Sequence, residues 1–408
     1  MMKQHFKFIL FIWSLATVNN FYGQVPISLK SAIDSATKNN LLLRNERLKA
    51  DYQKMLIKTS ANIPQTSVGI EYGQLNSWYS DTRFGIAQSI NFPTIYSKQK
   101  AVLTATWQNS VTQVKLKEKE LTKEVSNLYY LLYYLLEKEK LLLRSDSIYS
   151  DFLVKANLNF KIGESNILEK ITAETQSGQI ANQLNELRVD IKIIQFQFQY
   201  LLNTSTVFVP SEESFKLNYV ATSDSSQLIQ HPSVLIAKQQ RLIAEKNTAL
   251  EQSKLLPDLG ISYSNMSMKG EGADRQSYTT STRFQSFQFG IGIPLFYGSQ
   301  KASINASKIN ESIANSNYDN TVNQIKNEFI KAQQQFIKNT QMVDYYETLA
   351  LKNASTIINS AKTQLLNGEI NYIEFVLLTN QAIAIQNDYI NSVKNLNESI
   401  LNLKYLEQ

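Results

Sequence analysis

The feature that most constrains this chain is a stretch that occurs twice. Residues 156–176 return as residues 361–381, 205 positions later and without a gap. The identical pairs are Ala156 and Ala361, Gly163 and Gly368, Glu164 and Glu369, Asn166 and Asn371, Glu169 and Glu374, and Gln176 and Gln381. Each copy lies between two long helical patterns, so its glycine is expected to end a helix with a positive φ. Each copy is therefore predicted to be the bend of a helical hairpin.

Two further pairs of segments support a duplication. Residues 62–70 resemble residues 256–262, and residues 89–101 resemble residues 291–302. The order of these landmarks is the same in both halves, although their spacing indicates short insertions. We therefore expect residues 24–408 to form a single domain made of two structural repeats, at about 24–210 and 225–408.

The first 23 residues have the pattern of a secretory signal peptide. Lys3 and Lys7 precede an apolar run at residues 8–18, which is too short to span a bilayer as a helix. The sequence contains no cysteine, so a lipid cannot be attached by a thioether. Downstream, the most apolar run, residues 128–136, is far below the ~20 residues of a spanning helix. If the mature chain crosses a membrane, it must do so as β-strands of a closed barrel.

Four segments alternate apolar with small or polar residues, as half-buried strands do. They are residues 66–73, 83–92, 258–265 and 284–295. This alternation is typical of an outer-membrane barrel, but four strands cannot close one, because the smallest barrels have about eight. Aromatic residues that could form membrane-interface girdles near the strand ends are Tyr72, Trp78, Tyr79, Phe92, Tyr96, Tyr263, Phe284, Phe296 and Tyr297. The alternative is a soluble sheet with these aromatic residues in its core.

Between the strands lie long helical patterns. An amphipathic pattern covers residues 27–61, with Leu41 and Leu48 among its apolar positions, and residues 97–160 contain neither proline nor glycine. The long segment has a coiled-coil seam at Val114, Leu121, Val125, Leu128, Leu132, Leu135 and Leu142, and its counterpart has Val322, Ile325, Phe329, Ala332 and Phe336. A helix of this length would be about 95 Å long. The shorter segments 28–62 and 165–203, placed end to end, would match it, so one long helix should pack beside two shorter ones in each half.

The order of these elements resembles the TolC-type family of outer-membrane channel proteins over essentially the whole mature chain. The strand-exit stretch at residues 91–97 is similar to the branch that serves heavy-metal efflux systems of the resistance-nodulation-division type. The resemblance implies a homotrimer in which twelve strands, four per chain, form one outer-membrane β-barrel. This barrel would be continuous with a long periplasmic α-helical barrel. The expected fold class is thus an α+β membrane protein with an internal tandem duplication.

The resemblance also implies partners. These are outer-membrane lipid, a periplasmic adaptor (membrane fusion protein) and an inner-membrane resistance-nodulation-division pump. The chain would be a passive exit duct for substrates that the pump and adaptor deliver, with heavy-metal cations as a candidate cargo. A different function stays open, namely a periplasmic coiled-coil scaffold that contains a β-layer but has no channel activity.

Two groups of residues around the bends are candidate sites. The resemblance places acids near the periplasmic pore constriction, at positions that match Glu374 and Glu169, six residues after each bend glycine. The alternative is that both are solvated acids near a helix N-terminus. The expected adaptor-docking tips are Gly163, Glu164, Ser165, Asn166, Gly368, Glu369 and Asn371. The chain departs from the family at Leu365 and Ile370, where a tyrosine and an arginine hold the closed state, and at Asn39-Asn40, where Asn-Pro is frequent.

Enzymatic and cofactor chemistry lack their usual residues. Only His5, within the signal, and His231 are histidines, so nucleophilic triads and Cys or His metal sites cannot be assembled. The glycines at 290 and 292 belong to a strand pattern rather than to a dinucleotide-binding loop. The net charge of +6 is too small and dispersed to indicate nucleic-acid binding. We therefore expect no enzymatic activity, no cofactor and no resident metal.

Overall fold

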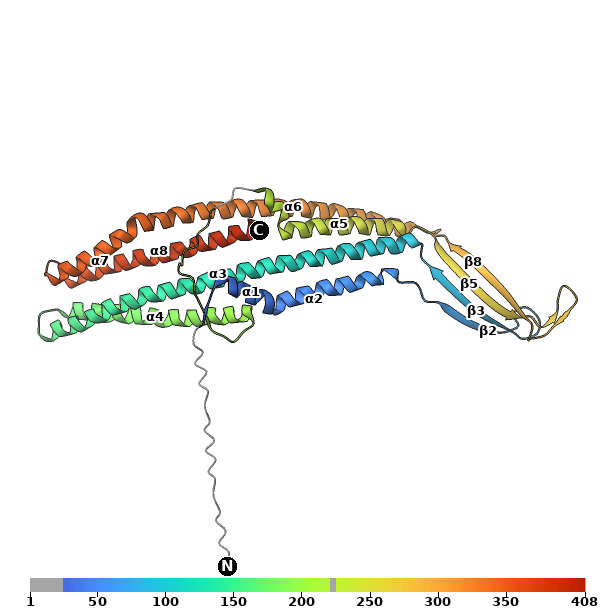
Figure 1. The fold of residues 1–408 in the computed structure, drawn as a ribbon, viewed down its shortest axis with the longest axis horizontal. Helices are drawn as coiled ribbons and strands as arrows, with labels where there is room; N and C mark the ends of the chain where they lie inside the picture. The colour runs from blue at the N-terminus through green and yellow to red at the C-terminus, as the bar shows by residue number, and fades with distance from the viewer. Residues whose placement is uncertain (1–24, 221–224, 408) are drawn as a thin grey trace, which may run out of the picture.

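The computed structural model describes residues 25–220 and 225–407, so the predicted signal peptide lies outside the described residues. The molecule is an elongated rod of roughly parallel helices with a small sheet at one end (Figure 1). The strands extend away from the helices at one end of the rod. The bends of two helical hairpins lie at the end remote from the strands. No helix in the described ranges is both long and apolar enough to cross a membrane.

The first half of the chain begins with two helices in line and ends with a hairpin of two long helices. Its elements are β1 (Val25–Ile27), α1 (Leu29–Asn39), α2 (Leu41–Leu56), the 3₁₀ turn η1 (Ile57–Ala61), β2 (Ser67–Gly73), β3 (Asp81–Ile90), α3 (Pro93–Lys161) and α4 (Ile167–Leu202). A linker with β4 (Phe208–Pro210) follows, and β4 pairs with β1 in parallel. Neither β1 nor β4 was expected from the sequence.

The second half uses the same order of elements. They are η2 (Ser225–Gln230), α5 (Pro232–Ser253), β5 (Asp258–Ser267), the short hairpin β6 (Gly270–Glu271) and β7 (Ser277–Tyr278), β8 (Arg283–Gly292), α6 (Gly298–Tyr345), the π-helical turn η3 (Tyr346–Ala350), α7 (Leu351–Leu366) and α8 (Tyr372–Glu407). The run from α6 to α7 starts and ends 205 residues after α3 does. Pro93 begins α3, whereas Pro294 lies four residues before α6, so these two prolines are not structurally equivalent.

The helices form a layer in which each long helix contacts two shorter ones stacked in line, as predicted. Helix α3 packs against α1, α2 and α4 on one side and against α5 and α8 on the other. Helices α5 and α8 in turn contact the continuous α6–α7 run. The layer therefore has α2 and α4 at one edge and α6 and α7 at the other, as the ribbon in Figure 1 shows.

The predicted seams form the core of the rod. Leu121, Val125, Leu132, Leu135 and Leu142 of α3 are buried, as are Ile325, Phe329 and Ala332 of α6. Two tyrosines on α3 are fully buried, and each donates a hydrogen bond through its hydroxyl group. Tyr129 donates to the carbonyl oxygen of Ile27 at 3.0 Å, and Tyr149 donates to Oδ1 of Asn380 at 2.8 Å. These bonds satisfy polar groups that would otherwise destabilise an apolar core.

The prediction of one amphipathic pattern over residues 27–61 was wrong in detail, because the helix breaks at Asn40. This residue is buried and extended in its backbone, and its Oδ1 accepts hydrogen bonds from the amides of Leu42 and Leu43. Its Nδ2 donates to the carbonyl oxygen of Leu201. Such a cap starts a new helix with a different face, so Leu41 and Leu48 are exposed rather than buried.

His231 has the corresponding position in the second half. It is 1% exposed and is the N-cap of α5, where its Nδ1 accepts a hydrogen bond from the amide of Ser233 at 3.3 Å. Its ring meets the ring of Tyr405 edge-on, with centroids 5.2 Å apart. The structural equivalent of His231-Pro232 is thus Asn40-Leu41 rather than Asn39-Asn40.

The four predicted strands are present within about three residues of their expected ends. They form one antiparallel sheet in the order β2-β3-β5-β8. Because β2 and β8 are the outer strands, each has one edge that no described strand of this chain covers. The hairpin of β6 and β7, which the sequence did not predict, lies in the long connection between β5 and β8.

Candidate channel elements

The strand register places apolar side chains on one face of the sheet. Val68 lies opposite Ile86, Ile86 opposite Tyr263, and Tyr263 opposite Phe287. This face is open rather than packed into a core, since Ile70 is 77% exposed and Phe289 is 78% exposed. Other exposed apolar residues on or near this face are Val68, Tyr72, Ile261, Phe287 and Ile291, and those beyond the strand ends include Trp78, Phe296 and Tyr297. Such a surface is far more apolar than a soluble sheet presents to water.

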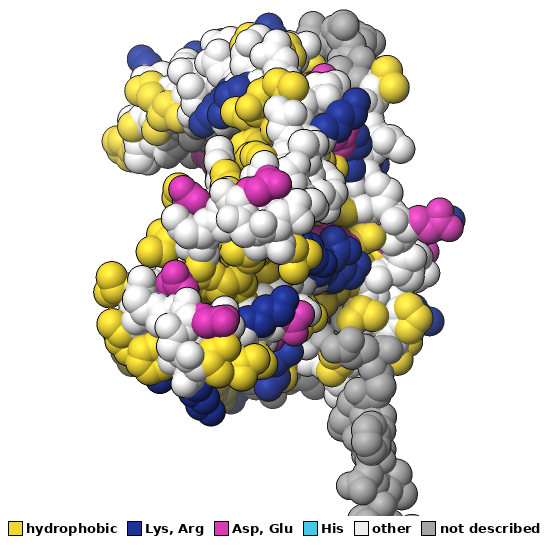
Figure 2. All heavy atoms as spheres, turned by 90° about the vertical axis from the view of Figure 1, so that its left-hand side faces the viewer, with side chains coloured by type: hydrophobic (Ala, Val, Ile, Leu, Met, Phe, Trp, Pro, Cys, Tyr) yellow, Lys and Arg dark blue, Asp and Glu magenta, His cyan; other side chains and the backbone are white. Residues whose placement is uncertain are grey.

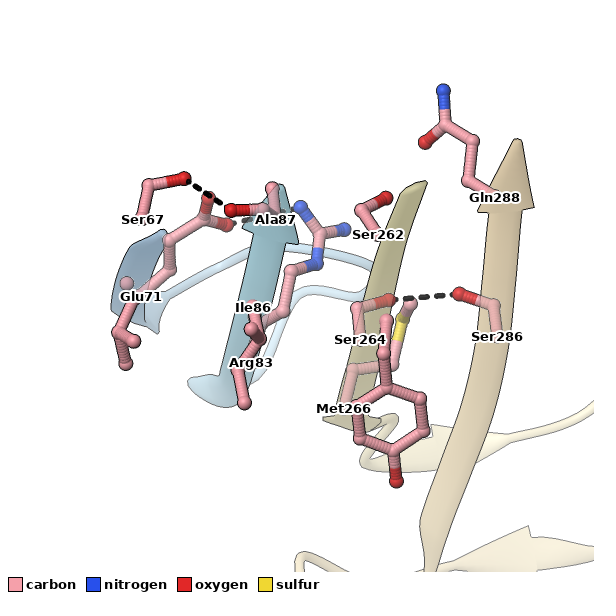
Figure 3. Close-up of a pocket in the computed structure, with 14 residues that line it drawn as sticks. Ser67, Glu71, Arg83, Ile86, Ala87, Ser262, Ser264, Met266, Ser286 and Gln288 are labelled. Carbon is pink, nitrogen blue, oxygen red and sulfur yellow. Dashed lines mark hydrogen bonds and ion pairs between the residues drawn. The ribbon is translucent and has the colours of Figure 1, made fainter. Parts of the chain in front are cut away.

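The opposite face is polar and hollowed. A cavity of about 530 Å³ lies on it, lined largely by small and polar side chains (Figure 3). Its lining includes Ser67, Gly69, Glu71, Arg83, Gly85, Ala87, Ser262, Ser264, Met266, Ser286 and Gln288. Ser264 and Ser286 are joined by a hydrogen bond of 2.7 Å, and Arg83 is paired with Glu71 at 2.9 Å. The cavity therefore lies on the side of the sheet that carries the small and polar side chains, and the exposed apolar side chains lie on the other side.

The two bends have the conformation that the glycine pattern predicted. Gly163 has φ of 81° and Gly368 has φ of 73°. In each bend the residue after the glycine donates a hydrogen bond to the carbonyl oxygen five positions earlier in the chain. The amide of Glu164 donates to Asn159, and the amide of Glu369 donates to Gln364. A second bond joins the glycine amide to the carbonyl three residues earlier. This is the Schellman arrangement, which requires a left-handed residue.

Replacing Gly368 with Val is expected to destabilise the second bend. No neighbouring atom lies within 4 Å of an added Cβ, so the cost is conformational, at least about 1–2 kcal/mol. Hydrogen exchange of the peptides around residues 360–375 should become faster in this variant. The matched control is Gly178→Val in α4, where there is equally open space but no positive φ. Equal protection in both variants would contradict the conformational role of Gly368.

The residues after each glycine cap the following helix. Asn166 accepts a hydrogen bond from the amide of Glu169, and Asn371 accepts one from the amide of Glu374. The carboxylate of Glu374 also accepts a bond of 2.9 Å from the amide of Asn371, which completes a reciprocal capping box. Glu374 is exposed, and Glu169 is partly exposed. Both acids lie in the first turn of a helix, where a negative charge is stabilising, and this alone explains their positions. A role of either acid in a pore stays a prediction.

All the candidate tip residues lie at the end of the rod remote from the sheet. Glu164, Asn166, Glu369 and Asn371 are exposed there, and Ser165 is partly buried. Figure 2 views the molecule from this end and shows acidic side chains scattered among exposed hydrophobic ones. The surface is thus mixed in character, with both charged and apolar groups available for contact.

An aromatic cluster that the sequence did not predict joins the two hairpins just behind the tips. The ring centroids of Phe152 on α3 and Tyr372 on α8 are 3.6 Å apart, and those of Phe152 and Phe375 are 5.4 Å apart. Burial raises the pKa of Tyr372, with smaller contributions from Tyr149 and the charge of Glu169. Leu365 and Ile370 pack against the same core. At these two positions the chain thus has apolar packing in place of the family's polar residues.

Two tyrosine–asparagine pairs extend this connection along the rod. Tyr149 bonds to Asn380, as described above, and Tyr134 donates to Oδ1 of Asn391 at 2.8 Å. Both pairs join α3 of the first half to α8 of the second. To predict these pairs from the sequence, one would need to know how two helices more than 200 residues apart in the chain are aligned with each other. The periodicity of each helix alone does not give this alignment.

The linker between the halves is attached at the π-helical turn. Nζ of Lys216 lies 2.8 Å from both carboxylate oxygens of Glu347 within η3, and Tyr389 of α8 donates to the same carboxylate at 3.0 Å. Burial, with help from Glu347, raises the pKa of Tyr389 to about 12. Asn397 of α8 bonds the linker backbone on both sides of Lys216. The helix axis changes direction at this turn, as Figure 1 shows between α6 and α7.

The part of the chain that the structure describes contains no group of three or more His, Cys, Asp or Glu residues positioned to hold a metal ion. Met266 lies in β5 and Met268 follows directly after that strand, and neither belongs to such a group. Met266 accepts a hydrogen bond from Nδ2 of Asn76 at 3.4 Å through its sulfur atom.

Neither a protein-family model nor a curated protein matches the sequence. The fold, in contrast, is well represented among solved structures. A membrane protein from Pseudomonas aeruginosa aligns with a TM-score of 0.81 and 15% identity, over 94% of this chain and 91% of that one. CusC, described in connection with transmembrane channel formation, aligns with a TM-score of 0.78 and 14% identity, over 94% and 93%. The CmeC outer membrane channel of Campylobacter jejuni aligns with a TM-score of 0.78 and 16% identity, over 93% and 85%.

These alignments extend over nearly the whole described chain and include both the sheet and the helical rod. The chain therefore has the fold of the TolC-type outer-membrane channels. This confirms the resemblance that the order of the sequence elements indicated.

Proposed function

We propose that this chain is the outer-membrane channel component of a tripartite efflux system, a passive exit duct for substrates that an inner-membrane pump and a periplasmic adaptor deliver. The observation that carries the proposal is the sheet, which has an exposed apolar face, a hollow polar face and two open edges. A periplasmic scaffold would have no use for an apolar face of this kind. A lipid-exposed barrel needs such a face, together with a polar interior.

The arrangement of the edges supports closure of the barrel. The strands of one chain alternate in direction, so β8 of one copy can pair with β2 of the next in antiparallel fashion. The helical layer also has exposed apolar residues at both edges, namely Val189, Ile193, Phe196 and Tyr200 on α4, and Ile309, Ile313, Ile330 and Ile337 on α6. Different surfaces on the two edges favour head-to-tail contacts, which form a closed ring when the rotation between neighbouring copies closes. Three copies would give twelve strands and a periplasmic helical barrel.

The same arrangement supports an orientation of the chain and a place of contact for its partners. With the sheet in the outer membrane, the tips around Gly163 and Gly368 project into the periplasm, where an adaptor would meet them. The strand-exit stretch at residues 91–97 favours the heavy-metal branch, with metal cations as cargo and a resistance-nodulation-division pump as the energy source.

The proposal is tested by assembly and conductance. The purified protein should require detergent, migrate as a trimer on an unheated gel, fractionate with outer membranes and form ion-conducting pores in planar bilayers. The scaffold alternative predicts a protein that is soluble without detergent and does not conduct. A detergent-dependent trimer without conductance under any voltage or pH would contradict the role of an open duct.

Within this proposal, Glu374 contributes negative charge to the periplasmic constriction. Three copies of the residue around the trimer axis would raise the local concentration of cations. Glu374→Gln retains a side-chain oxygen that can accept the hydrogen bond from the amide of Asn371, so assembly should be normal while cation preference and block by divalent cations decrease in single-channel recordings. Glu169→Gln is expected to have a smaller effect of the same sign. Unchanged selectivity in Glu374→Gln would leave capping as the only role of this carboxylate.

A further inference from the structure

The strand register arranges the polar face of the sheet in rows of directly paired residues. The outermost row in which all four strands are paired contains Glu71, Arg83, Met266 and Phe284, and beyond it, away from the helices, Gly73 pairs with Asp81. The next rows contain Gly69, Gly85, Ser264 and Ser286, then Ser67, Ala87, Ser262 and Gln288, then Ser89, Gly260 and Gly290. Long side chains thus occupy the first row completely, whereas glycine, serine and alanine make up nearly all of the others.

We propose that this first row, the outer belt, is the narrowest part of the barrel lumen and contributes to the ion selectivity of the channel independently of Glu374. The inference rests on the proposed function, since it requires the polar face to line a closed barrel. Three copies of the row would surround the lumen near its outer mouth, beneath the connections between the strands. Rows of glycine and serine on the helical side would leave a wider passage.

Contacts in the structure hold the belt side chains in place. Asn76 bonds to the sulfur atom of Met266, and the ring of Tyr278 in the β6–β7 hairpin meets the ring of Phe284 edge-on at 5.4 Å. Nη1 of Arg83 donates to Oε2 of Glu71, its direct partner across the two strands, as Figure 3 shows. Side chains with fixed partners can narrow a passage persistently, whereas free ones would move aside.

The belt is balanced in charge because Glu71 and Arg83 are present once each per copy. Among the cavity-lining residues on the polar face, these two are the only ionisable ones. Nε of Arg83 is buried without a hydrogen-bond partner among the described residues, so the guanidinium retains donor capacity beyond its bond to Glu71. Removal of one partner would therefore leave three unpaired charges of one sign around the lumen, where a small cross-section strengthens their effect on ions.

Charge selectivity is tested by reversal potentials in planar bilayers with a gradient of KCl. Relative to the unmodified channel, Glu71→Gln should shift the preference toward anions, and Arg83→Gln should shift it toward cations. The exchanged pair, Glu71→Arg with Arg83→Glu, is the matched control and should return the reversal potential to the original value. Unchanged reversal potentials in both single variants, with normal trimers, would overturn the proposal.

The steric role is tested separately, so that a constriction in the helical part does not mask it. Because the sequence lacks cysteine, Ser264→Cys places a single thiol one row inside the belt. On intact cells, a small thiol reagent should label this position in either background, whereas a polymer-linked maleimide should label it only after Met266→Gly and Phe284→Gly. Equal labelling by the large reagent in both backgrounds would contradict a narrow belt. Failure of the unmodified protein to conduct at all would contradict the proposed function instead.

Discussion

Phe289→Arg is expected to prevent assembly of the protein in the outer membrane. Phe289 is 78% exposed on the apolar face near the middle of β8, between Phe287 and Ile291 on the same face. An arginine on the lipid-facing side of a barrel costs about 2 to 4 kcal/mol near the bilayer midplane. Since each copy of a trimer would carry the charge, this cost recurs three times. The measurement is the amount of heat-modifiable trimer in the outer-membrane fraction.

The adjacent residue supplies a matched control. Gln288 is on the polar face of the same strand, where it lines the cavity with Ser262. Gln288→Arg introduces the same side chain one residue away, but into the water-filled lumen, and should assemble in near-normal amounts. Equal assembly of the two variants would be strong evidence against a barrel whose polar face lines the lumen and whose apolar face contacts lipid.

Mild acid is expected to destabilise the protein through His231. Burial and, to a smaller extent, the nearby charge of Lys119 lower the pKa of His231 from its ordinary value of 6.5 to about 4. Burial also lowers the pKa of Lys119 to about 8, and both side chains lie near the ring of Tyr405. In the unfolded chain the histidine takes up a proton below pH 6.5, whereas in the folded chain it remains neutral.

The sign of the effect follows from proton binding. Between pH 6.5 and about 4 the unfolded state binds more protons, so stability is complete above pH 6.5 and falls as the pH decreases toward 4. The loss from this group should be roughly 2 to 3 kcal/mol per copy. The melting temperature of the trimer, measured between pH 6.5 and 4, should decrease accordingly. In His231→Asn, whose side chain can still cap α5, the part of this pH dependence that His231 causes should disappear. Because His231 is the only histidine outside the predicted signal peptide, no other imidazole can account for the slope.

The elements that sequence predicted well are those that local chemistry specifies. Strand alternation located β2, β3, β5 and β8, and the glycine at each bend indicated a positive φ that the structure has at Gly163 and Gly368. The seams of α3 and α6 were predicted because burial in packed helices repeats at a regular spacing. The candidate residues at the tips were likewise placed together at one end of the rod, since each hairpin must bend there.

The features that were missed depend on distant contacts. The break at Asn40 relies on a bond to the carbonyl of Leu201, 161 positions along the chain, and the stack of Phe152 on Tyr372 joins two halves. The pairing of Glu71 with Arg83 required the register of a hairpin with a long loop, which alternation alone does not determine. The capping role of Glu374 could have been found, because an Asn three residues before a Glu at a helix start is a local signal.

The π-helical turn at Tyr346–Ala350 makes the two hairpins of one chain inequivalent. Helix α3 and the α6–α7 run span matching positions, yet only the second contains a turn with a wider hydrogen-bonding pattern, which bends the axis of α7 away from α6. A trimer would present six similar hairpin ends to the periplasm, but these would alternate between a straighter and a bent type. Six equivalent hairpin ends would have approximate sixfold symmetry, whereas two alternating types have only threefold symmetry. A partner that contacts all six ends would then have to adopt two alternating modes of contact.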